Sequence, residues 1–381
     1  MKIMDVTSIS LCMIVRDEEE HLAKCLNSVK DVADEIIVVD TGSRDKSAAI
    51  AESFGALIFF HQWNDSFSIP RNISLDHASG DWILVLDADE VLAPQSKNQI
   101  KAAVQRDEIR GYEVLIQLSP KWTAMRSLRL FKRSPEVRYE GIFHEKLTVP
   151  NRDLCAYVPS EITIIHKPWC KQDIDKKRAR NINLLNRHID LYPHDLYQIF
   201  DLIRLNLETG GGTDEAEKLL DKASVLLISI ESHDRNYKLY HGSYYLYKLI
   251  LCSKQKINLK DMLPLCEQAV SALPGCPLFL YETAKICFKL AEYDKAADYF
   301  QQCIDLGTSE KFDRSLIFPK EILGALSTAG LGHCFFKKRD YQKAEHYFNE
   351  AYVLKKDEKV KMMISACRHL KEGSHPPSRF S

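Results

Sequence analysis

Two carboxylates, Asp87 and Asp89, follow a run of five apolar residues, 82–86, and this arrangement could bind a metal ion. An uninterrupted apolar run is typical of a central parallel strand that is covered on both faces. Open α/β sheets bind ligands at the carboxyl ends of such strands, which is where both aspartates would lie. Mg²⁺ and Mn²⁺ prefer such oxygen ligands and keep coordination positions open for substrate phosphates. The alternative is an acidic turn that caps the next helix, and Asp-x-Asp by itself does not decide between the two.

The chain before these aspartates alternates between predicted strands and predicted helices. Apolar runs at residues 9–15, 35–40 and 56–60 predict three strands, and the second of them ends in a further carboxylate, Asp40. A helix is expected after the first strand, because apolar residues recur on one helical face at positions 22, 25, 26 and 29, with acidic residues in its first turn. Helices are also expected around residues 48–54 and 71–78. This order predicts a parallel, doubly wound sheet with right-handed crossovers.

Three blocks at matching spacing carry a resemblance. Residues 13–18 read Met-Ile-Val-Arg-Asp-Glu, residues 37–45 read Ile-Val-Val-Asp-Thr-Gly-Ser-Arg-Asp, and residues 84–90 read Leu-Val-Leu-Asp-Ala-Asp-Glu. Together they resemble family 2 glycosyltransferases of the GT-A fold, which is Rossmann-like with a mostly parallel sheet. The resemblance is strong over residues 8–92 and continues more loosely to about residue 169.

The resemblance implies a nucleotide-sugar donor. It places Val15 beside the uracil, Asp40 on the imide N–H, Asp87 on the ribose and Asp89 on a Mg²⁺ or Mn²⁺ ion at the diphosphate. The chain has Asp17 where many members of the family have Asn, which leaves the role of this residue open. The residues expected at the donor site are Val15, Arg16, Asp17, Glu18, Asp40, Ser43, Arg71, Asn72, Asp87, Ala88, Asp89 and Arg129.

Segments further along the chain carry a closer resemblance. Residues 129–132, 139–145, 165–169 and 178–184 are similar to peptide S-glycosyltransferases of the sublancin type, in which a GT-A domain is joined to a helical tail. This similarity thins after about residue 205. It implies a bacteriocin-like peptide as the acceptor, although the pair His144-Glu145 is also common among two-domain relatives with other acceptors.

Glycosyl transfer needs a stabilised leaving group and a base. The reaction passes through an oxocarbenium-like state while the nucleotide diphosphate departs. A metal on Asp89 would neutralise that diphosphate, and Arg71 or Arg129 could assist as cations. The incoming thiol or hydroxyl needs a base within hydrogen-bond reach.

Two histidines and one glutamate complete the set of candidates. Glu145 and His144 are the candidate catalytic residues, against a structural salt bridge for Glu145 and a satisfied strand-end histidine for His144. His166 follows a predicted strand at 162–165 and is a candidate second metal ligand, against a packed histidine, since a lone His is a weak metal signal.

The second half of the chain has the pattern of helical repeats. Residues 284–303 align with residues 332–351, with small residues and aromatics at matching positions, as in tetratricopeptide repeats. Two degenerate units are expected upstream, around residues 216–223 and 266–274, and residues 306–322 are expected to be an insertion. Such arrays expose a concave binding surface. The tyrosines at 244, 245 and 247 could line that groove, or they could be part of the core.

Composition narrows the class of protein further. The net charge of −1 over 381 residues gives no reason to expect nucleic acid or an anionic membrane as a partner. The sequence has no apolar run near ~18 residues and no signal-peptide pattern, so we expect no membrane span. Eleven scattered cysteines without a CxxC pair predict reduced, buried thiols in a cytoplasmic protein.

These observations predict a GT-A domain at 1–171, a helical linker at 172–212, a tetratricopeptide-like domain at 213–370 and a disordered tail at 371–381. The predicted activity is inverting transfer of a hexose, glucose by preference, from a UDP-sugar to a Cys or Ser of a bacteriocin-like peptide held by the repeats. The alternatives are a saccharide or cell-envelope acceptor and a non-catalytic repeat scaffold. The sequence is also compatible with a homodimer.

Overall fold

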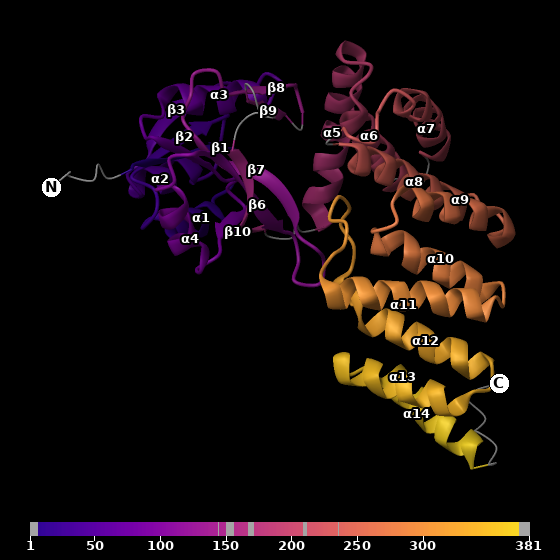
Figure 1. The fold of residues 1–381 in the computed structure, drawn as a ribbon. Helices are drawn as coiled ribbons and strands as arrows, with labels where there is room; N and C mark the ends of the chain where they lie inside the picture. Colours follow the sequence, from indigo (N-terminus) through magenta and orange to yellow (C-terminus); the bar gives the residue numbers. More distant parts are fainter. Residues whose placement is uncertain are drawn as a thin grey trace. The chain divides into compact units, whose positions relative to one another are not determined.

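The computed structural model describes residues 7–143, 145–149, 156–166, 171–208, 212–234 and 236–372. The chain divides into two compact units, one formed by Met1–Pro120 and Ala124–Gln198 and the other by Lys121–Thr123 and Ile199–Ser381. In Figure 1 the first unit carries the strands, and helices make up the orange and yellow part of the second. The division falls within the segment 172–212 that was predicted to be a linker.

The first unit contains an eight-stranded sheet with the order β3-β2-β1-β4-β7-β6-β10-β5 and a two-stranded sheet, β8-β9. The strands are β1 (Ile9–Val15), β2 (Glu35–Asp40), β3 (Leu57–Phe60), β4 (Trp82–Val85), β5 (Glu90–Leu92), β6 (Ile109–Gln117), β7 (Met125–Lys132), β8 (Arg138–Glu140), β9 (Lys146–Thr148) and β10 (Ala156–His166). The helices of this unit are α1 (Leu22–Val29), α2 (Ser47–Ser53), α3 (Ser68–His77), α4 (Ser96–Ala103) and α5 (Lys171–Leu191).

The parallel half of the sheet agrees with the sequence prediction. β1 pairs in parallel with β2 and with β4, and β2 pairs in parallel with β3. The apolar face of α1, which includes Leu22 and Leu26, is fully buried against this sheet. The prediction that acidic residues occupy the first turn of α1 was wrong. The helix begins only at Leu22, after the acidic residues 17–20. They belong to the loop after β1, whose role at the site is described below.

The sheet is mostly parallel, as predicted for the GT-A fold, but it is not parallel throughout. β7 runs antiparallel between β4 and β6, and β5 runs antiparallel to β10. The physical reason is the short connection between β6 and β7, because a hairpin joins antiparallel strands and a parallel pair needs a longer crossover. β10 then returns parallel to β6.

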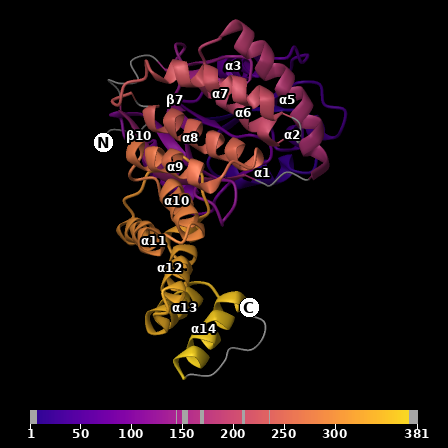
Figure 2. The same cartoon turned by 90° about the vertical axis from the view of Figure 1, so that its right-hand side faces the viewer.

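The second unit is built from helix pairs, which confirms the predicted helical repeats. Its helices are α7 (Thr213–Leu227), α8 (Tyr237–Lys254), α9 (Leu259–Ala272), α10 (Pro277–Lys289), α11 (Tyr293–Ser309), α12 (Ala325–Lys337), α13 (Tyr341–Leu354) and α14 (Glu358–Lys371), and α6 (Leu196–Glu208) spans the division between the units. Figures 1 and 2 both show α10 to α14 following one another as a stack. After β10, the described residues form no further strand, apart from a single bridge between Trp122 and Pro319.

The repeat positions have the packing that the sequence pattern predicted. The small residues Ala284, Ala296 and Ala344 have no exposed surface. A Cβ atom added to Gly332 would lie 2.7 Å from the ring of Phe348, so only glycine lets α12 and α13 approach this closely. The predicted insertion corresponds to a loop and the short 3₁₀ helix η1 (Lys320–Leu323) between α11 and α12. Tyr244, Tyr245 and Tyr247 of α8 are half-buried and pack against aromatic neighbours, as core positions do.

Three smaller expectations have mixed outcomes. None of the helices in the described part of the chain is long and apolar enough to cross a membrane. Nine cysteines lie among the described residues; all are free, and eight of them are buried. Burial raises the pKa of such thiols, as for Cys12, to about 12. The predicted tail from residue 373 onwards lies outside the described residues, whereas residue 371 still belongs to α14.

Candidate active site

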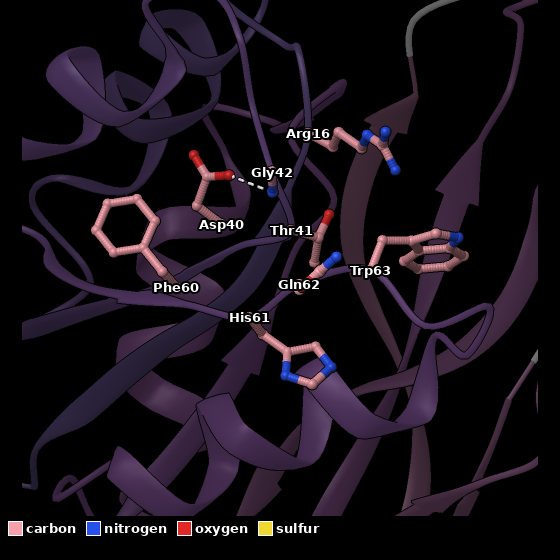
Figure 3. A pocket seen from close by; sticks show the side chains of 8 residues that line it. All are labelled: Arg16, Asp40, Thr41, Gly42, Phe60, His61, Gln62 and Trp63. Carbon is pink, nitrogen blue, oxygen red and sulfur yellow. Dashed lines mark hydrogen bonds between the residues drawn. The ribbon is translucent and has the colours of Figure 1, made fainter.

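The carboxyl ends of neighbouring parallel strands form a pocket. The register pairs Val15 with Asp40 and Asp40 with Phe60, so that β1, β2 and β3 end side by side. The pocket has a volume of about 430 Å³. Figure 3 shows the eight residues that line it: Arg16, Asp40, Thr41, Gly42, Phe60, His61, Gln62 and Trp63. Val15 itself is buried in the sheet core beside the pocket.

Asp40 is held in place by the turn that follows it. Its Oδ1 atom accepts a hydrogen bond from the backbone N–H group of Gly42 at 2.8 Å (Figure 3) and another from that of Ser43 at 2.7 Å. Gly42 has φ +104°, a conformation that side chains rarely adopt. The other carboxylate oxygen, Oδ2, has no hydrogen bond from the described residues and is available to a ligand. Asp40 is only 2% exposed, so an N–H placed there would meet a desolvated acceptor.

Asp17 locks the loops after β1 and β2 together. Its φ is +54°, its N–H lies 3.1 Å from Ser43 Oγ, and its Oδ1 accepts the N–H of Arg44 at 2.7 Å. The N–H of Glu18 donates to Ser47 Oγ at 2.8 Å. Asn and Asp are the side chains that best tolerate a left-handed backbone and accept such a bond. Asp17 therefore suits both this backbone conformation and this hydrogen bond.

A second group of charged residues follows β4. Asp87 accepts from Arg71 Nη2 at 2.6 Å and from Arg129 Nη2 at 3.3 Å. Arg71 Nε also pairs with Glu145 Oε1, and Arg129 Nη2 pairs with Glu90 Oε1 at 3.2 Å. The remaining guanidinium nitrogen, Arg71 Nη1, is buried and lacks a hydrogen-bond partner among the described residues. The segment after β4, the start of β5, α3, β7 and the segment after β8 thus bring two cations and three carboxylates together.

The charges of this cluster depend on one another. Burial disfavours the charged form of Asp87, but Arg71 and Arg129 hold the pKa of its carboxyl well below the ordinary value. Burial raises the pKa of Glu90, which is only 1% exposed, against the opposing effect of Arg129. Burial also raises the pKa of Tyr139, whose ring lies 5.5 Å from the Arg71 guanidinium, to about 12. Asp87 therefore stays ionised at neutral pH.

Asp89 and His166 lie together next to this cluster. His166 pairs with Glu90 in the antiparallel register of β10 and β5, which brings its Nε2 atom to 3.6 Å from Asp89 Oδ2. Neighbouring ligands of one octahedral Mg²⁺ or Mn²⁺ ion, each ~2.1 Å from it, lie about 3 Å apart. The pair therefore fits two positions of a cation, with the others left for phosphate and water. The described residues contain no group of three or more potential metal ligands.

The other predicted site residues have these positions. Both polar ends of the Asn72 side chain bind the backbone of Tyr139, at 2.9 and 2.8 Å, so Asn72 supports β8 next to Arg71. Ala88 is buried in the core below the two aspartates. His144 lies outside the described residues.

Sequence reasoning missed several residues of the site. The sequence places Glu90 in a motif without a role, and in the structure it accepts the N–H of Asp87 at 2.8 Å and pairs with Arg129. The pocket residues after β3 were also missed, including Trp63 and His61, whose Nε2 is buried without a hydrogen-bond partner among the described residues. Their position after a strand next to Asp40 was the signal that could have found them.

The first unit has the GT-A fold. Residues 10–133 match the family described as Glycosyl transferase family 2, and this segment is therefore a domain of that family, as its sequence blocks predicted.

Two curated relatives and one solved structure illustrate the similarity. A TPR repeat-containing protein of Synechococcus elongatus is 44% identical over 142 residues, which are 37% of this chain and 35% of that protein. The SPbeta prophage-derived glycosyltransferase SunS of Bacillus subtilis is 29% identical over 206 residues, which are 51% of this chain and 48% of that protein. Glucosyl-3-phosphoglycerate synthase from Mycobacterium tuberculosis aligns with a TM-score of 0.35 and 16% identity over 48% of this chain and 80% of that chain. The chain spans from about a third to about half of the length of the two curated relatives.

Proposed function

We propose that this protein is an inverting glycosyltransferase that moves a hexose, glucose by preference, from a UDP-sugar to a Cys or Ser side chain of a peptide. The observation that carries the proposal is the placement of Asp40, Asp87 and Asp89 at the carboxyl edge of one sheet, beside Arg71. This edge is where open α/β sheets bind nucleotides.

The uridine part of the donor would occupy the pocket beside Asp40. The free Oδ2 atom of Asp40 is an acceptor, and the imide N–H of uracil is the matching donor. Cytosine has an acceptor at the same ring position, so Asp40 would favour UDP over CDP. Trp63 and Arg16 line the same pocket and would contact the base and the first phosphate.

The diphosphate would lie between Arg71 and the pair Asp89–His166. Arg71 Nη1 is buried without a hydrogen-bond partner among the described residues, and a phosphate oxygen would satisfy it. Asp89 and His166 would hold the divalent cation, which when bound neutralises the leaving diphosphate. Asp87, kept ionised by its two arginines, would accept a hydrogen bond from the ribose hydroxyls.

Glu145 is the proposed base for the acceptor. Its Oε1 atom is engaged by Arg71, which leaves Oε2 for the proton of the incoming group. Its side chain is only 10% exposed, so the proton would be transferred in a site with little water. A thiol, with an ordinary pKa of ~8.5, needs less help from a base than a serine hydroxyl. His144 remains the second candidate.

The peptide acceptor is proposed on two grounds. The segments after residue 129 resemble peptide S-glycosyltransferases, and the chain shares 29% identity with SunS over about half of its length. Helical repeats present elongated surfaces suited to extended or helical peptides. Mass spectrometry of candidate peptides after incubation with UDP-glucose would show a hexose adduct. Transfer to saccharides instead, with no adduct on any peptide, would overturn the peptide acceptor but not the donor site.

The variant Asp40→Asn tests the donor site with its structural role preserved. The Asn Oδ1 can still accept from Gly42 and Ser43, whereas its NH₂ group replaces the free acceptor by a donor. A buried polar mismatch costs about 1–3 kcal/mol, so we expect UDP affinity to fall about 10- to 100-fold and CDP affinity to rise relative to UDP. Calorimetry measures both. Unchanged UDP affinity in a stably folded variant would remove Asp40 from the donor site.

A further inference from the structure

The loop that carries Glu145 is held by residues far away in the sequence. The N–H of Ile142 donates to Nδ1 of His188 in α5 at 3.3 Å. The carbonyl of Phe143 accepts from Nε2 of Gln198 in α6 at 2.6 Å. All of these residues belong to the first unit.

A third contact follows directly after Glu145. Lys146 Nζ bonds both carboxylate oxygens of Asp195 at 2.9 Å. The segment 141–146 is thus fixed at both ends by the end of α5 and the chain that follows it. Of the described residues of the loop, Glu145 alone has its side chain directed to Arg71.

Both ring nitrogens of His188 have hydrogen-bond partners. Because Nδ1 of His188 accepts a hydrogen bond from Ile142, the ring proton lies on Nε2, which faces Asp195 Oδ2 at 3.4 Å. Burial disfavours the charged form of Asp195, but hydrogen bonds from His188 and Lys146 outweigh it and lower its pKa to about 2. The ionised carboxylate therefore orients the imidazole, which in turn holds the loop.

The fit between the loop and the imidazole is tight. His188 and Gln198 are 3% and 1% exposed, so neither polar side chain can exchange its loop partner for bulk water. Gly141 has φ +98°, and a Cβ atom there would lie 3.1 Å from His188 Cε1. Glycine at this position therefore satisfies both the backbone conformation and the close approach.

We propose that His188, Asp195 and Gln198 are positioning residues that hold the segment 141–146, so that Glu145 stays on Arg71 at the site of transfer. This inference rests on the proposed function. It predicts that weakening these contacts lowers turnover without weakening donor binding, because none of the three residues lines the pocket beside Asp40.

The test compares two replacements of His188 in the full-length protein. His188→Phe keeps a ring of similar size but loses both hydrogen bonds. His188→Asn keeps an acceptor near the position of Nδ1. Hydrogen-exchange mass spectrometry should show at least tenfold faster exchange across residues 141–149 in His188→Phe and partial recovery in His188→Asn, with strand β1 unchanged. For UDP-glucose hydrolysis with Mn²⁺, kcat should fall at least tenfold in His188→Phe while KM stays within twofold.

Lys146→Met provides a second variant at a half-exposed position, in case the buried replacements do not fold. Lys97→Met is its matched control, because Lys97 Nζ forms a pair of the same length, 2.9 Å, with Asp31 between α4 and the turn after α1. Lys146→Met should speed exchange in residues 141–149, and Lys97→Met should not. Unchanged loop exchange in both His188→Phe and Lys146→Met would overturn the proposal. Faster hydrogen exchange in the loop with unchanged kcat would show that the contacts are purely structural, and this would also overturn the proposal. Absence of UDP-glucose turnover in the wild-type protein would count against the proposed function, while the exchange experiment would still decide whether the contacts hold the loop.

Discussion

Replacing Arg71 by methionine removes the cation that lies between Asp87 and Glu145. The methionine side chain fills much of the same volume, so the main loss is electrostatic. Asp87 keeps Arg129 at 3.3 Å, whereas no salt bridge joins Glu145 to another cation among the described residues. The perturbation therefore leaves one carboxylate of the site without its ion pair.

An exposed ion pair of nearly the same length serves as the control for the buried pair of Arg71 and Asp87. Arg138 Nη2 lies 2.7 Å from Asp76 Oδ1, almost the same distance as Arg71 Nη2 from Asp87 Oδ1, 2.6 Å. The arginine side chains differ in exposure, at 10% for Arg71 and 37% for Arg138. Breaking a buried pair costs about 3–5 kcal/mol, and an exposed pair contributes about 0–1 kcal/mol. Because Asp87 is still 32% exposed and keeps Arg129, we expect the lower end of the buried range, about 3 kcal/mol, for Arg71→Met.

Urea denaturation of both variants measures this difference. Tryptophan fluorescence follows the unfolding of the first unit through Trp82, which is buried in its core, and Trp122 adds a signal from the second unit. The free energy of unfolding should fall by about 3 kcal/mol in Arg71→Met and by less than about 1 kcal/mol in Arg138→Met, with similar m-values. Equal losses of unfolding free energy in the two variants would refute the reasoning that the Arg71 ion pairs stabilise the fold more because they are buried.

Two further predictions concern the loops around the site. Asp17→Ala should lose the bond to Arg44 and strain the backbone at φ +54°, which lowers the free energy of unfolding by about 2 kcal/mol in total. In the same urea assay, the free energy of unfolding of Asp17→Asn should lie within about 0.5 kcal/mol of the wild-type value. An equal loss in both variants would refute the role of Asp17 in joining the two loops. Because the pKa of Asp195 is about 2 in the folded protein, below its ordinary value of 3.8, its contribution to stability is present above about pH 4 and is lost as the pH falls toward 2. Asp195→Asn should therefore lose less stability than wild type between pH 4 and pH 2, and parallel pH profiles would contradict this.

The parallel half of the fold was predictable, because its strands are short apolar runs that end in polar turns. The helical repeats were predictable as well, since Ala284 and Ala344 recur at positions where two helices touch. The strands β6 and β7 were not, because their pairing joins residues far apart in the sequence and their side chains alternate less clearly, and of β10 only the part at 162–165 was predicted. The helix α1 begins later than predicted because the acidic residues before it are used in bonds between loops.

The residues of the candidate site also fall into a group that was predictable from the sequence and a group that was not. Strand ends and motif residues such as Asp40 and Asp89 were identifiable from type and spacing. Partners such as Tyr139 and His188 were not, because they reach the site only through tertiary packing. Asn72 shows the converse case, in which a residue predicted near the diphosphate uses its amide to hold a neighbouring strand.

The central claim is that Asp89, with His166, holds a divalent cation against the diphosphate of a UDP-sugar. Calorimetry of UDP binding to the wild type and to Asp89→Ala, each with Mn²⁺ and with EDTA, tests it most directly. We predict that Mn²⁺ strengthens UDP binding to the wild type at least tenfold, about 1.4 kcal/mol or more, and that Asp89→Ala binds UDP with the same weak affinity in Mn²⁺ and in EDTA. Metal-enhanced binding that persists in Asp89→Ala, or wild-type binding that is indifferent to EDTA, would contradict the claim.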